Sequence, residues 1–209
     1  RVRVRREPLP RRVVVDGIPC VPPELALAQA VPGLDRRRAV ALMDSARHRR
    51  VLTEDGFRRA RDLARGRRGA ARVARCWEES DPRAESPAES WARLSAGDHG
   101  APPDALQLVV RDAAGRFRAR VDMAWHLPDG VLLVEVDGRE AHSRLEALVD
   151  DRRRQNRIAT RRTTLLRFSG TDAWDGTLGA EVAGFLRGAG WSPRPCRSTA
   201  PTGCRRSSR

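Results

Sequence analysis

The sequence contains no lysine and no tyrosine, so all 41 of its basic side chains are arginines. This bias is typical of a GC-rich coding genome, and part of the arginine content therefore reflects codon usage. No apolar run approaches the roughly 18 residues of a membrane span, and no apolar segment follows the basic N-terminus. The four cysteines lie far apart without a CxxC pair, which disfavours a zinc site and a disulfide scaffold. We therefore expect a cytoplasmic protein without a membrane anchor or a signal peptide.

Acidic residues are less abundant than arginines, with 27 Asp and Glu and a formal net charge of +14. A strongly basic chain is expected to bind a polyanion, above all nucleic acid. The alternative is codon bias on a solvated surface. The excess charge is uneven, because residues 1–85 carry +9, residues 86–170 carry +2 and residues 171–209 carry +3. Acids gather among apolar residues in the middle third, and we expect the chemistry there.

The pattern of apolar residues predicts an α/β protein with three parts. Residues 1–84 combine short β-like runs with small arginine- and alanine-rich helices, expected over 25–30, 35–48, 53–63 and 70–79. A polar, proline-bearing stretch then marks a domain boundary. Residues 85–190 predict the order helix, three antiparallel strands, helix, strand and helix, over 86–95, 106–110, 117–123, 131–136, 144–160, 163–168 and 178–187. The tail over 191–209 is rich in Pro, Ser and Arg, and we expect it to be disordered.

Three acidic residues lie close together in the predicted sheet. Glu135 and Asp137 are two residues apart and leave the same face of one strand, and the turn over 128–130 brings Asp122 opposite them. Carboxylates this close repel one another unless a cation or a proton offsets the charge. Oxygen ligands of this kind favour Mg²⁺ or Mn²⁺. Each acid alone could instead be structural, with Asp137 in a strand-end turn and Asp122 paired with a neighbouring arginine.

Residues on both sides of these strands could complete the site. Glu89, on the helix before the sheet, could add a fourth carboxylate, and His142 could act as a general acid or base. Arg153, Arg157 and Arg161 recur every four residues and share one helix face. Guanidinium groups beside a metal site suit a phosphodiester substrate. The same stripe could also be a solvated helix face.

Three segments of the chain resemble a known nuclease family. RVDMAWHLPDGVLLVEVDGREAH, DDRRRQNR and TLLRFSG are similar to the very-short-patch-repair-type endonuclease domain of the PD-(D/E)xK superfamily, across about residues 85–175. The linker SDPRAESPAES resembles the linker of actinobacterial proteins that carry this domain behind an AbiEi-type antitoxin winged helix. Residues 20–80 resemble the middle part of those AbiEi-like chains more loosely. In chains of that kind the winged helix would precede residue 1, and we expect it to be absent from this sequence.

The resemblance implies a restriction-endonuclease-like core of helix, three strands, helix and strand. It assigns metal binding to Asp122 and Glu135, and it aligns Asp137 with the second acid of an E-x-D-G motif. It also aligns Glu89 with a glutamate of the first helix. His142 corresponds to the second member of a His-His pair.

Two positions of the chain depart from the family pattern. Ala141 stands where many relatives have the first histidine of the pair. Asp137 occupies the superfamily's lysine position, and the chain has no lysine elsewhere. Positive charge for the transition state is therefore expected from the metal, from His142 or from an arginine such as Arg153.

Together these observations predict a nuclease that hydrolyses phosphodiester bonds, with DNA as the expected substrate and Mg²⁺ or Mn²⁺ as cofactor. Asp122 and Glu135 would hold the metal, and Asp137 would orient a water molecule or bind a second ion. The alternative is a non-catalytic DNA-binding regulator of the AbiEi antitoxin type that uses the nuclease fold as a scaffold. A third interpretation is a basic scaffold without a defined site. The sequence leaves a dimer and a toxin partner open.

Overall fold

The computed structural model describes residues 11–112, 114–137 and 162–193. Within these residues the chain forms a two-stranded hairpin, a four-stranded mixed sheet and seven α-helices. The expected α/β class is confirmed. None of the helices in this described part has the length and apolar character needed to cross a membrane.

The N-terminal region consists of a small hairpin and short helices. The hairpin pairs β1 (Val13–Val15) with β2 (Ile18–Cys20). The helices are α1 (Pro23–Ala30), α2 (Arg36–His48), α3 (Glu54–Ala64) and α4 (Cys76–Glu79), with 3-10 turns η1 (Val31–Gly33) and η2 (Ala71–Val73). The single helix expected over 70–79 is wrong, because η2 lies against η1, where Arg72 donates to the Pro32 carbonyl oxygen at 3.1 Å. The helix resumes only at α4.

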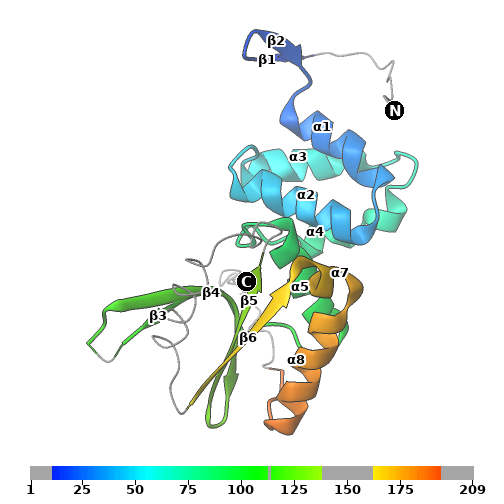
Figure 1. Ribbon diagram of the computed structural model, residues 1–209. Coiled ribbons are helices and arrows are strands. Elements are labelled where there is room, and N and C mark those ends of the chain that lie inside the picture. The colour runs from blue at the N-terminus through cyan, green and yellow to red at the C-terminus, as the bar shows by residue number, and fades with distance from the viewer. Residues whose placement is uncertain (1–10, 113, 138–161, 194–209) are drawn as a thin grey trace, which may run out of the picture.

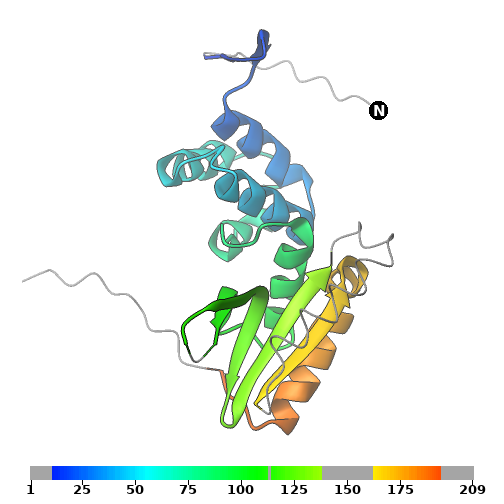
Figure 2. The same cartoon turned by 60° about the vertical axis from the view of Figure 1, so that its left-hand side comes forward.

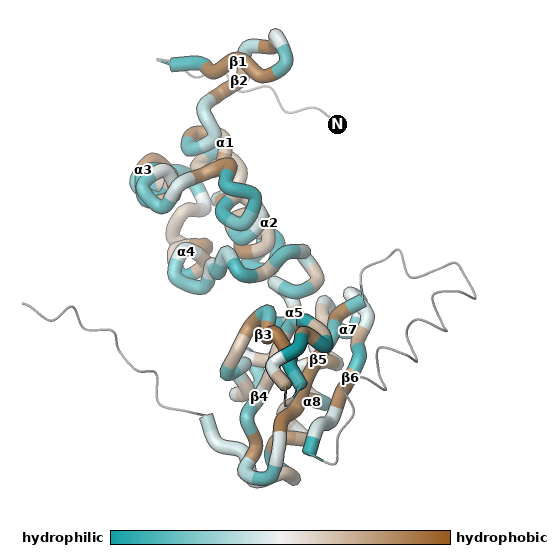
Figure 3. Tube along the Cα trace, turned by 90° about the vertical axis from the view of Figure 1, so that its left-hand side faces the viewer, coloured by the Kyte–Doolittle hydropathy of each residue, from teal (hydrophilic) through white to brown (hydrophobic). Residues whose placement is uncertain are grey.

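Side-chain caps fix where the longer helices begin. Asp35, Thr53 and Ser86 each accept a hydrogen bond from the backbone N–H three residues further on, at 2.9, 3.1 and 3.2 Å. A cap of this type contributes about 1 kcal/mol. Along α2 and α3, Figure 3 shows short hydrophobic segments interrupted by hydrophilic ones. Their apolar faces form one core with Phe57 against Trp77 at a ring-centroid distance of 5.1 Å.

The second part of the molecule is built on one sheet. Its strands are β3 (Ala105–Arg111), β4 (Phe117–Leu127), β5 (Gly130–Asp137) and β6 (Thr163–Ser169), in that spatial order. The first three strands are antiparallel and β6 runs parallel to β5. The predicted strands are therefore confirmed, and the helix expected over 144–160 lies outside the described residues.

Three helices belong to this part: α5 (Pro87–Asp98), α7 (Gly170–Asp175) and α8 (Thr177–Gly188). Alanines of α5 pack with Trp125, Val134 and Leu178 in a core between the helices and the sheet. Figure 2 shows β5 and β6 side by side with α8 behind them. The sequence did not predict α7, which follows β6 directly and is closed by a capping box between Ser169 and Asp172.

Helix α5 joins the two parts of the molecule (Figure 1). Asp44 of α2 is buried, with 1% of its surface exposed, and accepts hydrogen bonds from Ser90 Oγ at 2.8 Å and from Arg93 Nη2 at 2.9 Å, both on α5. It also accepts the backbone N–H of Asp81 at 2.7 Å. Burial raises the pKa of Asp44, whereas the Arg93 charge opposes that rise. The helical region is thus fastened to α5 through a buried ion pair.

Replacing Asp44 with alanine should destabilise the protein by about 3 kcal/mol, because it leaves the Arg93 guanidinium buried without its carboxylate. Urea unfolding followed by circular dichroism measures the change. The matched control is Asp55→Ala on the exposed start of α3, which should shift the free energy of unfolding by no more than about 0.5 kcal/mol. Equal effects of the two substitutions would contradict the role of the buried pair.

Candidate active site

Strands β4 and β5 separate before either of them ends. Their antiparallel ladder stops at the pair Met123 and Val134, although both strands continue past it. Beyond that pair a side chain replaces the backbone acceptor, because Asp122 Oδ2 accepts the N–H of Val136 at 2.8 Å. Figure 1 shows the resulting fork, in which the β3–β4 hairpin turns away from β5 and β6. The fork holds the Asp122 carboxylate in a position set by the backbone of the neighbouring strand.

Gln107 of β3 links two of the predicted acids. Its Nε2 donates to Glu89 Oε2 at 2.8 Å and lies 3.4 Å from Asp122 Oδ1. The residue has a φ of +52°, in the left-handed region that side-chain-bearing residues seldom adopt. Strain of this kind costs about 1–3 kcal/mol and clusters at functional sites. In this protein the strained residue is Gln107, whose side-chain amide contacts the carboxylates of Glu89 and Asp122.

Glu89 reaches this position from the first turn of α5. The Ser86 cap fixes the start of the helix, and Glu89 Oε2 also accepts the N–H of Glu85 at 2.8 Å. The N-terminus of a helix carries a partial positive charge that favours a carboxylate there. Glu89 therefore lies at the positive end of α5, where Gln107 links it to Asp122.

Glu135 forms the buried side of the cluster. It pairs in register with Arg167 across the parallel β5–β6 ladder, and Arg167 Nη2 donates to Glu135 Oε2 at 2.7 Å. The two side chains are only 7% and 20% exposed. A buried carboxylate needs such a partner, since desolvation alone costs several kcal/mol. The pair brings a positive charge to the carboxylates from a strand that the sequence did not implicate.

The electrostatics of the fork are most evident at Asp122. Burial raises the pKa of this carboxyl to about 6, the Val136 N–H opposes the rise, and the charges of Glu89 and Glu135 add to it. Burial and the neighbouring carboxylates thus disfavour the ionised form of Asp122, and its hydrogen bonds offset this effect only in part. A cation or a proton at the fork would relieve this repulsion.

The remaining predicted residues are less closely placed, or lie elsewhere. Asp137 is exposed at the last position of β5, where it is in register with Ser169. Of the two arginines that could pair with Asp122 in the structural alternative, Arg120 bonds through Nη2 to Glu85 Oε2 at 2.7 Å, and Arg139 lies outside the described residues. His142, Arg153, Arg157 and Arg161 lie outside the described residues.

Metal ligation by Asp122, Glu135 and Asp137 stays a prediction. Over residues 11–112, 114–137 and 162–193, no group of three or more His, Cys, Asp or Glu side chains has the arrangement of a metal site. The acids that cluster at the fork are Glu89, Asp122 and Glu135, and each accepts a hydrogen bond from the protein. Asp122 accepts from Val136, Glu89 from Gln107, and Glu135 from Arg167.

Sequence reasoning missed Gln107 and Arg167. Each was marked by a weak signal, because Gln107 is the one polar residue in the run ALQLVV and Arg167 interrupts the apolar run LLRF. A single polar side chain inside an apolar strand can equally face solvent at a sheet edge. Only the pairing of the strands shows that both side chains reach the acids.

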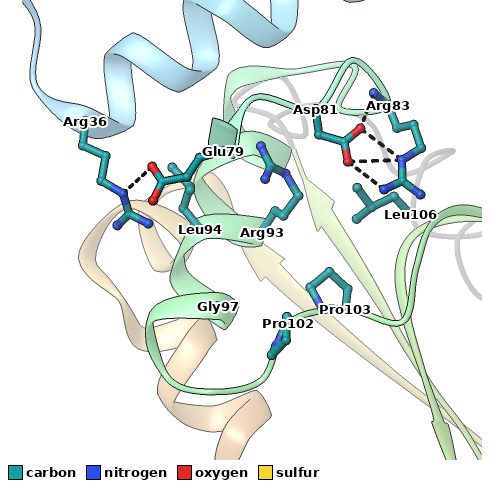
Figure 4. Close-up of a pocket in the computed structure, with 10 residues that line it drawn as sticks. All are labelled: Arg36, Glu79, Asp81, Arg83, Arg93, Leu94, Gly97, Pro102, Pro103 and Leu106. Atoms are coloured by element: carbon teal, nitrogen blue, oxygen red, sulfur yellow. Dashed lines mark hydrogen bonds and ion pairs between the residues drawn. The ribbon is translucent and has the colours of Figure 1, made fainter. Parts of the chain in front are cut away.

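A separate cavity of about 280 Å³ lies between the helical region and α5, and none of the clustered acids lines it. Figure 4 shows its charged side chains pairing with one another, Arg36 with Glu79 and Arg83 with Asp81. The fork and this cavity are therefore distinct features of the molecule.

The chain is similar in sequence to two mycobacterial proteins. It is 33% identical over 140 residues to each of the uncharacterized proteins MT2308 and Rv2248 from two strains of Mycobacterium tuberculosis. The match covers 67% of this chain and 51% of each relative, so the chain spans about half the length of the curated relatives it matches. No protein-family model and no solved structure matches the chain.

The raised pKa of Asp122 predicts a pH-dependent stability. The folded state favours the protonated carboxyl of Asp122. Ionising this carboxyl therefore destabilises the folded state: the loss of stability is absent at a pH below the pKa of Asp122 in the unfolded chain, and it reaches its full size at a pH above about 6. Without divalent cations, the free energy of unfolding should fall between about pH 4 and pH 7 by roughly 1–2 kcal/mol more in the native protein than in Asp122→Asn. The asparagine keeps an acceptor for the Val136 N–H.

Chemical denaturation at several pH values measures this difference, with Asp129→Asn in the exposed β4–β5 turn as the matched control. A pH profile that is the same in the native protein and in Asp122→Asn would contradict the assigned repulsion.

Proposed function

We propose that the protein is a metal-dependent nuclease that hydrolyses phosphodiester bonds in DNA. The single observation that carries this proposal is the fork between β4 and β5, where Glu89, Asp122 and Glu135 interact across three separate elements. A fold tolerates such a concentration of like charge when it has a use for a cation or a proton. The order helix, three antiparallel strands and a parallel strand supports a restriction-endonuclease-like core of the very-short-patch-repair type.

The donor set at the fork suits Mg²⁺ or Mn²⁺. Carboxylate and amide oxygens are the ligands that these ions prefer, and Asp122, Glu135 and Asp137 would hold the metal. A divalent ion held by these residues would supply Lewis-acid polarisation of the scissile phosphate and would acidify a water molecule. The raised pKa of Asp122 supports this fit, since a nearby cation removes the penalty for ionising that carboxyl.

The chain's own residues would orient the reaction. Gln107 holds Glu89 and Asp122 at a fixed separation through its amide. Arg167 forms a buried ion pair with Glu135 and fixes the position of its carboxylate. His142 would act as general acid or base, and Arg153, Arg157 and Arg161 would contact neighbouring phosphates.

A second candidate is a DNA-binding regulator of the AbiEi antitoxin type without catalytic activity. It is favoured by the exposed Asp137 at the superfamily's lysine position and by the ion pair that engages Glu135. Such a regulator should bind duplex DNA without metal, with affinity that falls steeply with salt, and should leave the DNA intact.

Purified protein incubated with plasmid or single-stranded DNA and Mg²⁺ or Mn²⁺ should cleave the DNA. The double variant Asp122→Ala/Glu135→Ala should lose at least about 100-fold in rate, because it removes the metal ligands. The control Glu54→Ala/Asp55→Ala removes two exposed acids from α3 and should cleave as the native protein does. Circular dichroism verifies that both variants are folded. Cleavage that survives the loss of Asp122 and Glu135 would overturn the proposal.

A further inference from the structure

The β3–β4 hairpin extends beyond the fork as an arm. From Leu108–Val121 to Arg111–Phe117 the two strands pair with each other, and the β4–β5 ladder has already stopped at Met123. Figure 1 shows the arm projecting to one side of β5 and β6. In this part of β4 the edge that faces away from β3 is therefore not paired with β5.

The two faces of the arm differ in chemistry. One face packs its apolar side chains inward, and these are Leu108, Val110, Ala119 and Val121. The opposite face is open to solvent. It presents apolar and basic groups together: Val109 at 42% exposure, Phe117 at 62%, and Arg111, Arg118 and Arg120.

The outward face is basic and leads to the candidate active site. Residues 105–121 contain four arginines and one acidic residue, Asp112. Arg120 and Arg118 precede Asp122 by two and four residues along β4. Two basic groups thus lie on the part of the arm that leads to the carboxylate at the fork.

The ion pairs of these arginines are exchangeable. Arg118 bonds to Asp112 at 2.8 Å and Arg120 to Glu85 at 2.7 Å, with the two arginine side chains 36% and 48% exposed. An ion pair of a solvent-exposed arginine contributes about 0–1 kcal/mol. Phosphate groups can therefore compete with the carboxylates for Arg118 and Arg120.

We propose that this outward face of the β3–β4 arm is a binding surface for duplex DNA. The inference rests on the proposed function in taking nucleic acid as the partner, and it adds the surface and the form of the substrate. A two-stranded ribbon fits the major groove of B-form DNA, which is about 12 Å wide. The major groove of A-form RNA is too narrow for side chains to enter.

The basic and the apolar side chains of this face contact different parts of the DNA. Arg118 and Arg120 contact phosphates and direct the strand toward Asp122, whereas Phe117 and Val109 make apolar contacts at the groove. Phosphate contacts set the register of a protein on DNA and make binding sensitive to salt. The apolar contacts strengthen binding without a salt dependence.

Fluorescence anisotropy with a labelled duplex DNA, measured in EDTA over a range of salt concentrations, tests the surface directly. The variant Arg118→Ser/Arg120→Ser should bind about tenfold more weakly or worse, and its salt slope should fall by about 2. Phe117→Ser should weaken binding and leave the slope unchanged. The control Arg58→Ser/Arg65→Ser removes two exposed, ion-paired arginines from the α3 region and should bind within about threefold of the native protein.

A duplex RNA of the same sequence is the second probe and should bind more weakly than the DNA. The inference is overturned if the arm variant binds as the α3 control does, if duplex RNA binds as tightly as DNA, or if no duplex binds. It is also overturned if sedimentation shows that the arm substitutions abolish self-association and leave DNA binding intact. Because EDTA prevents metal-dependent cleavage, DNA binding without nuclease activity in Mg²⁺ would refute the proposed function and leave this surface in place.

Discussion

The hydrogen bond from the Val136 N–H to Asp122 is the interaction on which the candidate site depends. Where β4 leaves β5, the backbone groups of β5 lose their ladder partners, and a buried N–H without an acceptor would cost about 1–3 kcal/mol. Asp122 supplies that acceptor and is drawn to the point of divergence. The same contact brings a charge beside Glu135 and Glu89. The fork therefore creates the carboxylate cluster and the repulsion within it.

The surrounding structure holds this cluster from three directions. Arg167 neutralises Glu135 from β6, and Gln107 reaches across from β3 in a strained backbone conformation. Helix α5 contributes Glu89, and the buried pair of Asp44 and Arg93 fastens α5 to the helical region. The N-terminal helices thus position a residue of the site, and the arginine-rich region is part of its support.

Much of the architecture could be predicted from the sequence, because local patterns determine it. Alternation in β4, the apolar run of β5 and the caps at Asp35 and Ser86 specify elements by short-range physics. The proximity of Asp122 to Glu135 followed from the turn between their strands. The roles of Gln107, Arg167 and Asp44 could not be predicted, since each depends on a contact between residues at least 15 positions apart. The break at η2 likewise depends on packing against η1.

Proton release on metal binding tests the central claim most directly, because the account requires a cation to replace the proton that burial and charge repulsion keep on Asp122. Calorimetric titration of Mg²⁺ or Mn²⁺ into the protein near pH 6, in two buffers of different ionisation enthalpy, counts the protons released. Metal binding should release up to about one proton, and Asp122→Asn should lose that release. Absence of metal binding, or proton release that is unchanged in Asp122→Asn, would contradict it.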